Sequence, residues 1–412
     1  MVWKTSKLGD ACEMIKRGVG PKYLDEGGIC VVNQKCVRGH SVNYTLARRH
    51  DLDSKKVNEE RYIKVGDVLV NSTGTGTLGR VAQIRAVPPE PTTVDTHVTI
   101  VRPKPNVFFD DFFGYMLIKI EEEITLAGEG ASGQTELART KLENEFFVSY
   151  PDSILEQKRI VTILDQAFAS IDQARAKTEQ NLKNARELFE SYLQQVFSQR
   201  GEGWTESTLG EFAEFKNGLN FSKSSKGEKL KIVGVKNFNN NFFVPLQQLE
   251  TIQIDGCLAS GYELKENDII TVRSNGNKRL IGRCLLMGKT DRKTSYSGFT
   301  IRIRLTSQDI DPEFLTYYMK SASTHELLIG SGEGVNISNL NQKILTALPI
   351  HFPSTDTQLQ LVENVKKIEF ETSKLIQVYE KKLNTIDELK KSILQKAFTG
   401  ELTKEKNKKA VT

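Results

Sequence analysis

SYLQQVF at residues 191–197 returns almost unchanged as SILQKAF at residues 392–398, 201 residues later in a chain of 412. The similarity extends well beyond this stretch. Further pairs at nearly the same spacing are Trp3 with Trp204, Leu8-Gly9 with Leu209-Gly210, Gly79-Arg80 with Gly282-Arg283, Tyr115-Met116 with Tyr318-Met319, and Pro151 with Pro353. Self-similarity at a fixed spacing is the signature of a repeated structural unit. The chain is therefore predicted to be one unit written twice.

Each copy closes with a long helical pattern. After Pro151 and again after Pro353, the sequence runs for roughly 45 residues without proline or glycine, which is about 65–70 Å of helix at 1.5 Å per residue. Apolar residues step by three and four positions through both segments, as in helices that pack along a seam. Ser153 with Glu156, and Thr355 with Gln358, predict a capping box at each helix start. Two helices packed antiparallel are favoured over helices that each cover only their own module.

The segments before the helices predict mixed strands and helices. Short apolar or alternating runs such as ICVV (29–32) and GFTIRIRL (298–305) are typical of strands, and turns rich in Gly, Asn, Ser and Thr separate them. The predicted fold class is α+β: two tandem mixed α/β modules separated by two long helices that form an antiparallel coiled coil, with a pseudo-two-fold internal repeat. Connectivity then puts the modules at opposite ends of a helical rod.

The predicted boundaries follow from these patterns. They are residues 1–152 for the first module, 153–200 for the first helical spacer, 201–353 for the second module, 354–400 for the second spacer and 401–412 for a basic tail.

Composition indicates a cytoplasmic protein. Hydrophobic residues make up 38% of the chain and charged residues 26%, and no apolar run approaches the length of a membrane span. The amino-terminal MVWKTSKLGD lacks the apolar core of a signal peptide. The five cysteines are scattered without a C-x-x-C spacing, which favours reduced thiols over disulfides or a zinc site.

The distribution of charge is more informative than the net charge of +5. Residues 271–304 hold nine Lys/Arg and one acidic residue, and residues 16–102 hold fourteen Lys/Arg against nine acidic residues. Clustered cations of this kind suit the binding of phosphates, although a solvated face would give the same pattern.

Three short motifs resemble catalytic sites but lack the context that such sites need. GTGTLG (74–79) has the spacing of a dinucleotide-binding loop, yet a strand-like segment follows where a helix is required. DPEF (311–314) departs from the D-P-P-F of adenine methyltransferases in its third place, and no glycine-rich methyl-donor site accompanies it. Asp152, Glu156 and Lys158 imitate a nuclease site but lie together at a helix start. The histidines show no metal-ligand spacing. We therefore predict a protein without catalytic residues, bound metal or cofactor.

The polar loops contain the residue types that read DNA. Arg and Lys suit guanine, Asn and Gln suit adenine, and Ser, Thr and amides suit phosphate. The predicted contacts of the first module are Lys16, Arg17, Asn33, Gln34, Lys35, Arg38, Asn71, Ser72, Thr73 and Arg80. Those of the second module are Lys216, Asn217, Lys236, Asn237, Asn239, Arg273, Ser274, Asn275, Asn277, Lys278, Arg279 and Arg283. Similar frames with different loops predict two different half-sites, and hence an asymmetric bipartite target.

These features together resemble the specificity subunit of a Type I restriction–modification system, over essentially the whole chain. The W-x4-L-G starts and the paired Gly-Arg strands carry the resemblance, with ASGQTEL (131–137), P-x4-EQKRI (151–160) and SILQKAFTGEL (392–402). The second copy departs from the pattern, with GVNISNL (334–340) before its helix and TQLQLV (357–362) where EQ is typical.

The resemblance implies a role for each part. The modules would be target recognition domains that bind double-stranded DNA. The helices would act as a ruler between half-sites and dock two methyltransferase subunits, and motor–nuclease subunits would join the complex. S-adenosylmethionine, ATP and Mg²⁺ would belong to those partners. Two equal docking surfaces would then explain the repeated helix end. An architectural DNA-binding protein and a coiled-coil scaffold remain the alternatives.

Overall fold

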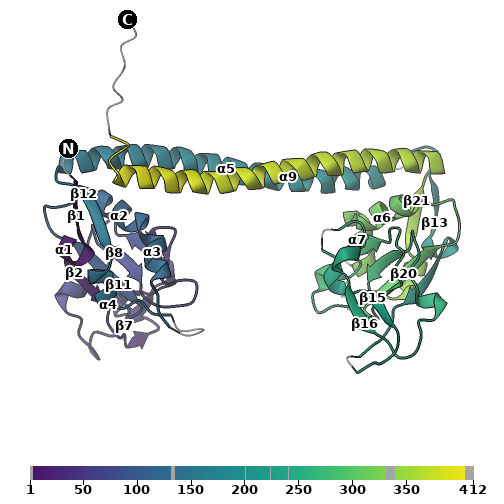
Figure 1. Cartoon of the computed structure of the whole chain (residues 1–412), viewed down its shortest axis with the longest axis horizontal. Coiled ribbons are helices and arrows are strands. Elements are labelled where there is room, and N and C mark those ends of the chain that lie inside the picture. The colour runs from purple at the N-terminus through teal and green to yellow at the C-terminus, as the bar shows by residue number, and fades with distance from the viewer. Residues whose placement is uncertain are drawn as a thin grey trace, which may run out of the picture. The chain divides into compact units, whose positions relative to one another are not determined.

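The computed structural model describes residues 3–130, 135–199, 201–222, 224–239, 241–330 and 339–403. The chain forms two compact units, one of Met1–Thr178 with Lys382–Thr412 and the other of Glu179–Lys381. Each unit holds one module and a part of both long helices (Figure 1). This division by compactness therefore differs from the predicted division into modules and spacers.

The first copy consists of the following elements: β1 (Trp3–Lys7), α1 (Leu8–Ala11), β2 (Cys12–Arg17), β3 (Tyr23–Leu24), β4 (Ile29–Val32), β5 (Val37–Arg38), β6 (Ser41–Val42), β7 (Arg48–His50), β8 (Val68–Asn71), β9 (Val81–Gln83), β10 (Thr92–Val94), β11 (Val98–Pro103), α2 (Asp110–Lys119), α3 (Glu121–Leu126), α4 (Arg139–Asn144), β12 (Phe147–Pro151) and the long α5 (Ile154–Ser198).

The second copy consists of β13 (Thr205–Thr208), β14 (Ala213–Asn217), β15 (Lys229–Val233), β16 (Glu250–Gln253), β17 (Ile269–Val272), β18 (Cys284–Leu286), β19 (Thr294–Tyr296), β20 (Thr300–Leu305), α6 (Pro312–Lys320), α7 (Ala322–Ile329), α8 (Gln342–Thr346), β21 (Pro349–Phe352) and the long α9 (Thr355–Phe398). Short 3-10 turns link some of these elements, among them Lys278–Leu280.

The two modules repeat one sheet topology. The main sheet has the order β2-β11-β8-β9 in the first module and β14-β20-β17-β18 in the second, and all its pairs are antiparallel. A second small sheet combines antiparallel and parallel pairs, β4 with β10 and β15 with β19 being the parallel ones. The predicted α+β class and the internal repeat are confirmed.

The main sheet of each module is covered on both faces. Successive residues of a strand point to opposite sides. Accordingly, Val68 and Val70 pack with the helices, whereas Leu69 packs with the residues of β4 and β10. Ile269 and Ile270 divide between two clusters in the same way. Burial on both faces explains why these strands read as continuous apolar runs.

A buried glutamine joins the first module to the start of α5. Its side-chain oxygen, Gln157 Oε1, accepts a hydrogen bond from the amide of Phe109 at 2.8 Å. Its Nε2 donates to the carbonyls of Val107 at 3.1 Å and Pro151 at 2.9 Å. These three hydrogen bonds link the side-chain amide of Gln157 to backbone groups of the module and of the strand that leads into α5.

The same junction is repeated at α9. Gln358 Oε1 accepts from the amide of Asp311 at 2.8 Å, and Nε2 donates to the carbonyls of Asp309 at 2.7 Å and Pro353 at 2.9 Å. The predicted capping box at Thr355 is therefore wrong, because Gln358 is used for the junction instead. At α5 the predicted box is half formed.

In that first box, Ser153 Oγ accepts a long 3.4 Å bond from the amide of Glu156. The return bond is missing, because Glu156 Oε1 is buried without a hydrogen-bond partner among the described residues.

Within the first unit, α5 and α9 pack antiparallel. Lys390 Nζ lies 3.2 Å from Asp172 Oδ1, and Arg175 pairs with Asp387. Higher residue numbers on α5 thus meet lower numbers on α9. Apolar residues of both helices join the core of the first module.

Within the second unit, the two helices are also antiparallel. Arg186 Nη2 lies 3.0 Å from Glu380 Oε1. Near the end of α5, Phe197 shares a core cluster with Val362 and Val365 from the start of α9. The predicted packing of the two helices is confirmed in each unit.

The repeated helix end lies in the cores of the two units. The ring of Phe197 is 5.3 Å from that of Phe314, and the ring of Phe398 is 5.1 Å from that of Phe112. Ala397 is fully buried. Our interpretation of this stretch as a docking surface is therefore corrected for its apolar positions. The core of the first module includes the end of α9 and that of the second module includes the end of α5, which gives the sequence a reason to repeat.

A tyrosine of each module bonds to its own unit's long helix. Tyr115 Oη donates to Asp165 Oδ1 at 2.5 Å, and Tyr317 Oη donates to Glu369 Oε2 at 2.7 Å. Tyr318 Oη instead donates to the carbonyl of Pro349 at 2.9 Å. The predicted pairing of Tyr115 with Tyr318 is thus one residue off. The structural counterpart of Tyr115 is Tyr317.

Candidate nucleic-acid interface

In the first module, three separate segments meet at the loop after β8. Asn71 Nδ2 donates to the carbonyl of Gln34 at 3.0 Å, and Thr73 Oγ1 donates to Gln34 Oε1 at 3.4 Å. Thr73 Oγ1 also lies 2.7 Å from His97 Nδ1, on the turn between β10 and β11. The structure thus brings together predicted contacts that lie far apart in the sequence.

In the second module, the loop from β17 to β18 carries most of the predicted contacts. Asn277 Oδ1 accepts from the amide of Arg279 at 3.1 Å and so caps the turn Lys278–Leu280. Lys278, Arg279 and Arg283 are exposed. The loop therefore combines a capped turn with exposed cationic side chains.

Both loops are held at their ends by equivalent backbone hydrogen bonds, which we call the backbone frame. The amide of Asn71 bonds to the carbonyl of Arg80, and that of Val272 bonds to the carbonyl of Arg283, each at 2.9 Å. Leu137 donates to Ser72 O at 2.8 Å, just as Leu340 donates to Arg273 O at 2.8 Å. The loop between these frame points is two residues longer in the second module, from Val272 to Arg283 rather than Asn71 to Arg80.

Three predicted contacts are buried within the modules. Ser72 Oγ lies 2.5 Å from Thr99 Oγ1, and Asn237 Oδ1 accepts from the amide of Gly234 at 2.8 Å. Asn71, where the loop after β8 begins, is fully buried. These side chains hold loops in place, so we assign them a positioning role.

Other predicted contacts are engaged with neighbouring side chains. Lys16 pairs with Glu60 at 2.8 Å, and Arg17 pairs with Glu136 at 2.6 Å. Lys236 pairs with Glu250. Lys216 Nζ lies 4.0 Å from the ring centroid of Tyr262. Asn33 donates a hydrogen bond to Leu46 O at 3.1 Å, and Arg80 donates one to Gly76 O at 2.6 Å.

The other predicted contacts differ in exposure. Lys35, Arg38 and Asn239 are exposed, whereas Asn217 is half-buried, and its Oδ1 is a buried acceptor without a hydrogen-bond partner in the described part of the chain.

The basic segment 271–304 is divided by the structure. Arg304 makes two hydrogen bonds to Asp268, at 2.7 and 2.6 Å, and Arg302 is buried with its Nη1 on the carbonyl of Gly261. These two cations belong to the interior. The first module repeats this pattern with the buried pair of Arg102 and Asp67.

Sequence reasoning missed three exposed residues beside these loops. His97 and Phe299 occupy the same turn in the two modules, and Phe221 is 41% exposed. Phe221 and Phe299 line a groove of about 440 Å³ with the predicted contacts Lys236, Ser274 and Asn275. The strand pattern GFTIRIRL concealed Phe299, because the ring lies on the turn that precedes β20.

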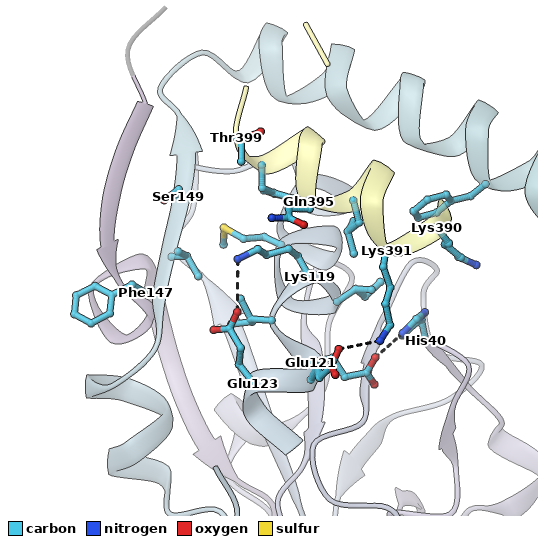
Figure 2. Close-up of a pocket in the computed structure, with 18 of the residues that line it drawn as sticks. His40, Lys119, Glu121, Glu123, Phe147, Ser149, Lys390, Lys391, Gln395 and Thr399 are labelled. Carbon is cyan, nitrogen blue, oxygen red and sulfur yellow. Dashed lines mark hydrogen bonds and ion pairs between the residues drawn. The ribbon is translucent and has the colours of Figure 1, made fainter. Parts of the chain in front are cut away.

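A larger groove of about 970 Å³ lies on the helix side of the first unit (Figure 2). Its walls come from the junction of α2 and α3, from β12 and from the end of α9. Lys391 pairs with Glu122 at 2.9 Å across it, and His40 Nε2 lies 2.7 Å from Glu121 Oε2. None of the predicted DNA contacts lines this groove, which we call the helix-side groove.

Two searches of the described ranges set limits on other kinds of site. No three His, Cys, Asp or Glu residues gather there in a way that could hold a metal ion. No helix within those ranges is long and apolar enough to cross a membrane.

The chain thus combines two α+β modules that carry polar loops with two long helices that pack antiparallel in each unit. The family described as "Type I restriction modification DNA specificity domain" matches residues 2–184 and again residues 201–386. The chain belongs to this family, and the predicted resemblance is confirmed.

Curated relatives agree with this assignment. The chain is 26% identical over 263 residues to the Type I restriction enzyme StySPI specificity subunit of Salmonella potsdam, covering 61% of this chain and 57% of that protein. It is 24% identical over 271 residues to the EcoKI specificity subunit of Escherichia coli K12, covering 61% and 56%. The chain thus spans little more than half the length of these relatives.

Solved structures show the same fold. A chain from work on complex assembly and conformational transition of the type I R-M system is 16% identical with a TM-score of 0.76, covering 97% of this chain and 98% of that one. The HsdS subunit from Thermoanaerobacter tengcongensis is 16% identical with a TM-score of 0.59, covering 97% of each chain.

Proposed function

We propose that this chain is the DNA-reading subunit of a Type I restriction–modification complex and has no catalytic site of its own. The observation that carries the proposal is the loop pair described above. Two identical backbone frames hold loops of different length and sequence, as two readers of different half-sites require. The exposed Lys278, Arg279 and Arg283 of the second loop would neutralise phosphates beside the bases read, as would Lys35 and Arg38 of the segment that meets the first loop.

The target follows from this arrangement. Each module would read one half-site, and because the loops differ, the two half-sites would differ as well. The target would be asymmetric and bipartite, with a gap set by the helices.

Docking of partner subunits is supported by a second repeat on the helices. Leu188 is 52% exposed and Leu389 is 48% exposed, and they occupy equivalent places in the repeated sequence EL-x-x-S-x-LQ-x-x-F. Their neighbours Phe197 and Phe398 are buried. These leucines do not pack in either core, so the folding of the modules does not explain why they are repeated. An exposed leucine at the same place in both copies would instead give two copies of one partner the same binding surface.

In this proposal the partners are two methyltransferase subunits and motor–nuclease subunits. S-adenosylmethionine, ATP and Mg²⁺ would be bound by those partners rather than by this chain. Phe370 and Val378 of α9, 57% and 58% exposed, add apolar surface for a protein partner in the second unit.

A genome-wide map of N6-methyladenine, with and without the gene in its host, tests the proposal. We expect one asymmetric, gapped motif to disappear with the gene. Exchange of the first module alone for that of a relative should change one half-site and keep the other. A chain that binds DNA equally well at all sequences would instead be an architectural protein.

A further inference from the structure

Two phenylalanines of the second module lie on its surface without completing its core. Phe299 is 63% exposed and Phe221 is 41% exposed. Both line the groove of about 440 Å³, where Lys236, Ser274 and Asn275 supply polar atoms. A single exposed aromatic residue is common, but two that line one groove beside a cationic loop indicate a binding surface.

The backbone at Phe299 is fixed from two sides. Its carbonyl accepts hydrogen bonds from the amides of Arg273 at 2.8 Å and Ser274 at 3.3 Å. The preceding Gly298 donates to the carbonyl of Leu219 at 2.7 Å. A side chain carried on a fixed turn has little backbone freedom to lose when it binds.

The same turn of the first module carries His97. Its carbonyl accepts from the amide of Ser72 at 2.8 Å, just as that of Phe299 accepts from Arg273. His97 is exposed, and its Nδ1 is hydrogen-bonded to Thr73. One position of a shared frame thus presents an apolar ring in one module and a polar ring in the other.

The surroundings of Phe299 suit nucleic acid. Lys278, Arg279 and Arg283 project from the loop that bonds to its backbone, and all three are exposed. Such cations hold phosphates, which brings base edges within reach of the neighbouring groups. An apolar side chain in the major groove recognises the C5-methyl group of thymine, which no other standard DNA base carries.

Resting on the proposed DNA-reading function, we propose that residues 97 and 299 are specificity-determining positions of the two modules. Phe299 contacts the methyl group of a thymine in the half-site of the second module. His97 contacts a polar base edge in the half-site of the first module.

The test uses the complex of this chain with its methyltransferase partner and a duplex that carries the mapped target. Each thymine of the second half-site is replaced in turn by deoxyuridine, which removes only the methyl group. At one position, binding by the wild-type complex should weaken about fourfold, as expected for one buried methyl group. Phe299→Ala should weaken binding about tenfold and make the complex insensitive to that deoxyuridine.

Two variants complete the design. Phe299→His, which places the first module's residue on the same turn, should lose the preference for thymine while the first half-site stays unchanged. Phe243→Ala is the matched control, because Phe243 is 47% exposed in the same module but does not line the groove. It should leave binding and deoxyuridine sensitivity as in the wild type.

The outcomes separate this inference from the proposed function. A wild-type complex that binds its target specifically, but responds to deoxyuridine equally with and without Phe299, overturns the inference alone. The inference also fails if no thymine of the second half-site responds. A wild-type complex without any sequence preference would overturn the proposed function itself.

Discussion

At the scale of single residues, the structure separates cations that can meet DNA from cations that hold the fold. Arg304 and Arg102 each make two hydrogen bonds to a buried aspartate, Asp268 and Asp67. Arg279 is exposed on a capped turn. Charge counted along the sequence cannot make this distinction, because the partners of Arg304 and Arg102 lie about 35 residues away.

Arg279→Ala is expected to remove one phosphate contact from the complex. The slope of log K against log salt should then become shallower by about 0.9. Stability should hardly change, because the capping bond at Arg279 comes from its backbone amide. Binding measured at several salt concentrations checks this, with Arg292→Ala as a control on a different exposed loop. An unaltered slope for Arg279→Ala would remove this residue from the interface.

The polar contacts show how far the sequence alone could lead. Residue types and repeat positions were enough to locate the loops after β8 and β17. They could not show that Asn71, Ser72 and Asn237 point inward, because burial depends on strands that approach from elsewhere in the chain. Nor could they reveal Phe299, whose exposure follows from the turn between β19 and β20, two strands of different sheets.

Tyr115 gives the fold a pH dependence on the alkaline side. Burial, together with its hydrogen bond to Asp165, raises the pKa of Tyr115 from the model-compound value of 10.0 to about 12. Burial also raises the pKa of Tyr317. A tyrosine with a raised pKa in the folded state binds its proton more tightly there than in the unfolded chain. Its contribution is complete below about pH 10 and is lost as the pH rises through about 12.

Tyr115→Phe should therefore cost about 1–2 kcal/mol at neutral pH, where a hydrogen bond to a carboxylate disappears. Between pH 10 and 12 the difference from the wild type should shrink. Melting temperatures of both proteins measured from pH 8 to 11.5 test this, with Tyr62→Phe as a control for general alkaline effects. A difference that stays constant over that range would contradict the assigned role of the hydroxyl.

At the scale of elements, the junction glutamines explain how a module is held on a long helix. Gln157 and Gln358 each satisfy one backbone amide and two carbonyls between module and helix. From the sequence alone, the second copy differs from the first in lacking EQ at its helix start. The three-dimensional pairing shows that the glutamine is kept and that the glutamate alone is replaced, by Thr357.

Gln157→Ala is expected to destabilise the first unit by about 2–4 kcal/mol, because buried backbone groups lose their partners. Gln166→Ala removes the same amide from an exposed position of α5 and should change stability by less than about 0.5 kcal/mol. Unfolding in urea of both variants measures the contrast. Equal small losses would mean that water replaces the junction bonds without cost.

The helix ends show why a repeated stretch was open to two interpretations. Phe197 and Phe398 repeat because each completes the core of a module, whereas Leu188 and Leu389 repeat on the surface. The sequence records both kinds of position in one motif. Only the packing of each unit separates the residues that the cores bury from those that stay exposed.

At the scale of the whole molecule, α5 and α9 are continuous helices of 45 and 44 residues, and each contributes to both compact units. Their pairing is antiparallel in both units, with Arg175 on Asp387 in one and Arg186 on Glu380 in the other. A change of length in one helix alone would break the register of one of these ion pairs. A test of the proposed ruler must therefore lengthen both helices together.

We expect seven residues added after Thr178 and seven added after Lys381 to lengthen the gap of the target while both half-sites stay unchanged. Seven residues add about 10.5 Å of helix, the length of about three base pairs of DNA at 3.4 Å each. A heptad departs from whole helical turns by only about 20°, whereas three base pairs turn the duplex by roughly 100°. The methylation rate should therefore fall even as the longer gap is selected.

A seven-residue insertion in α5 alone should instead lower the melting temperature, because the helices lose their register. Mapping methylated adenines for the paired insertion decides the matter, since an unchanged gap would mean that the helices do not set the distance between half-sites.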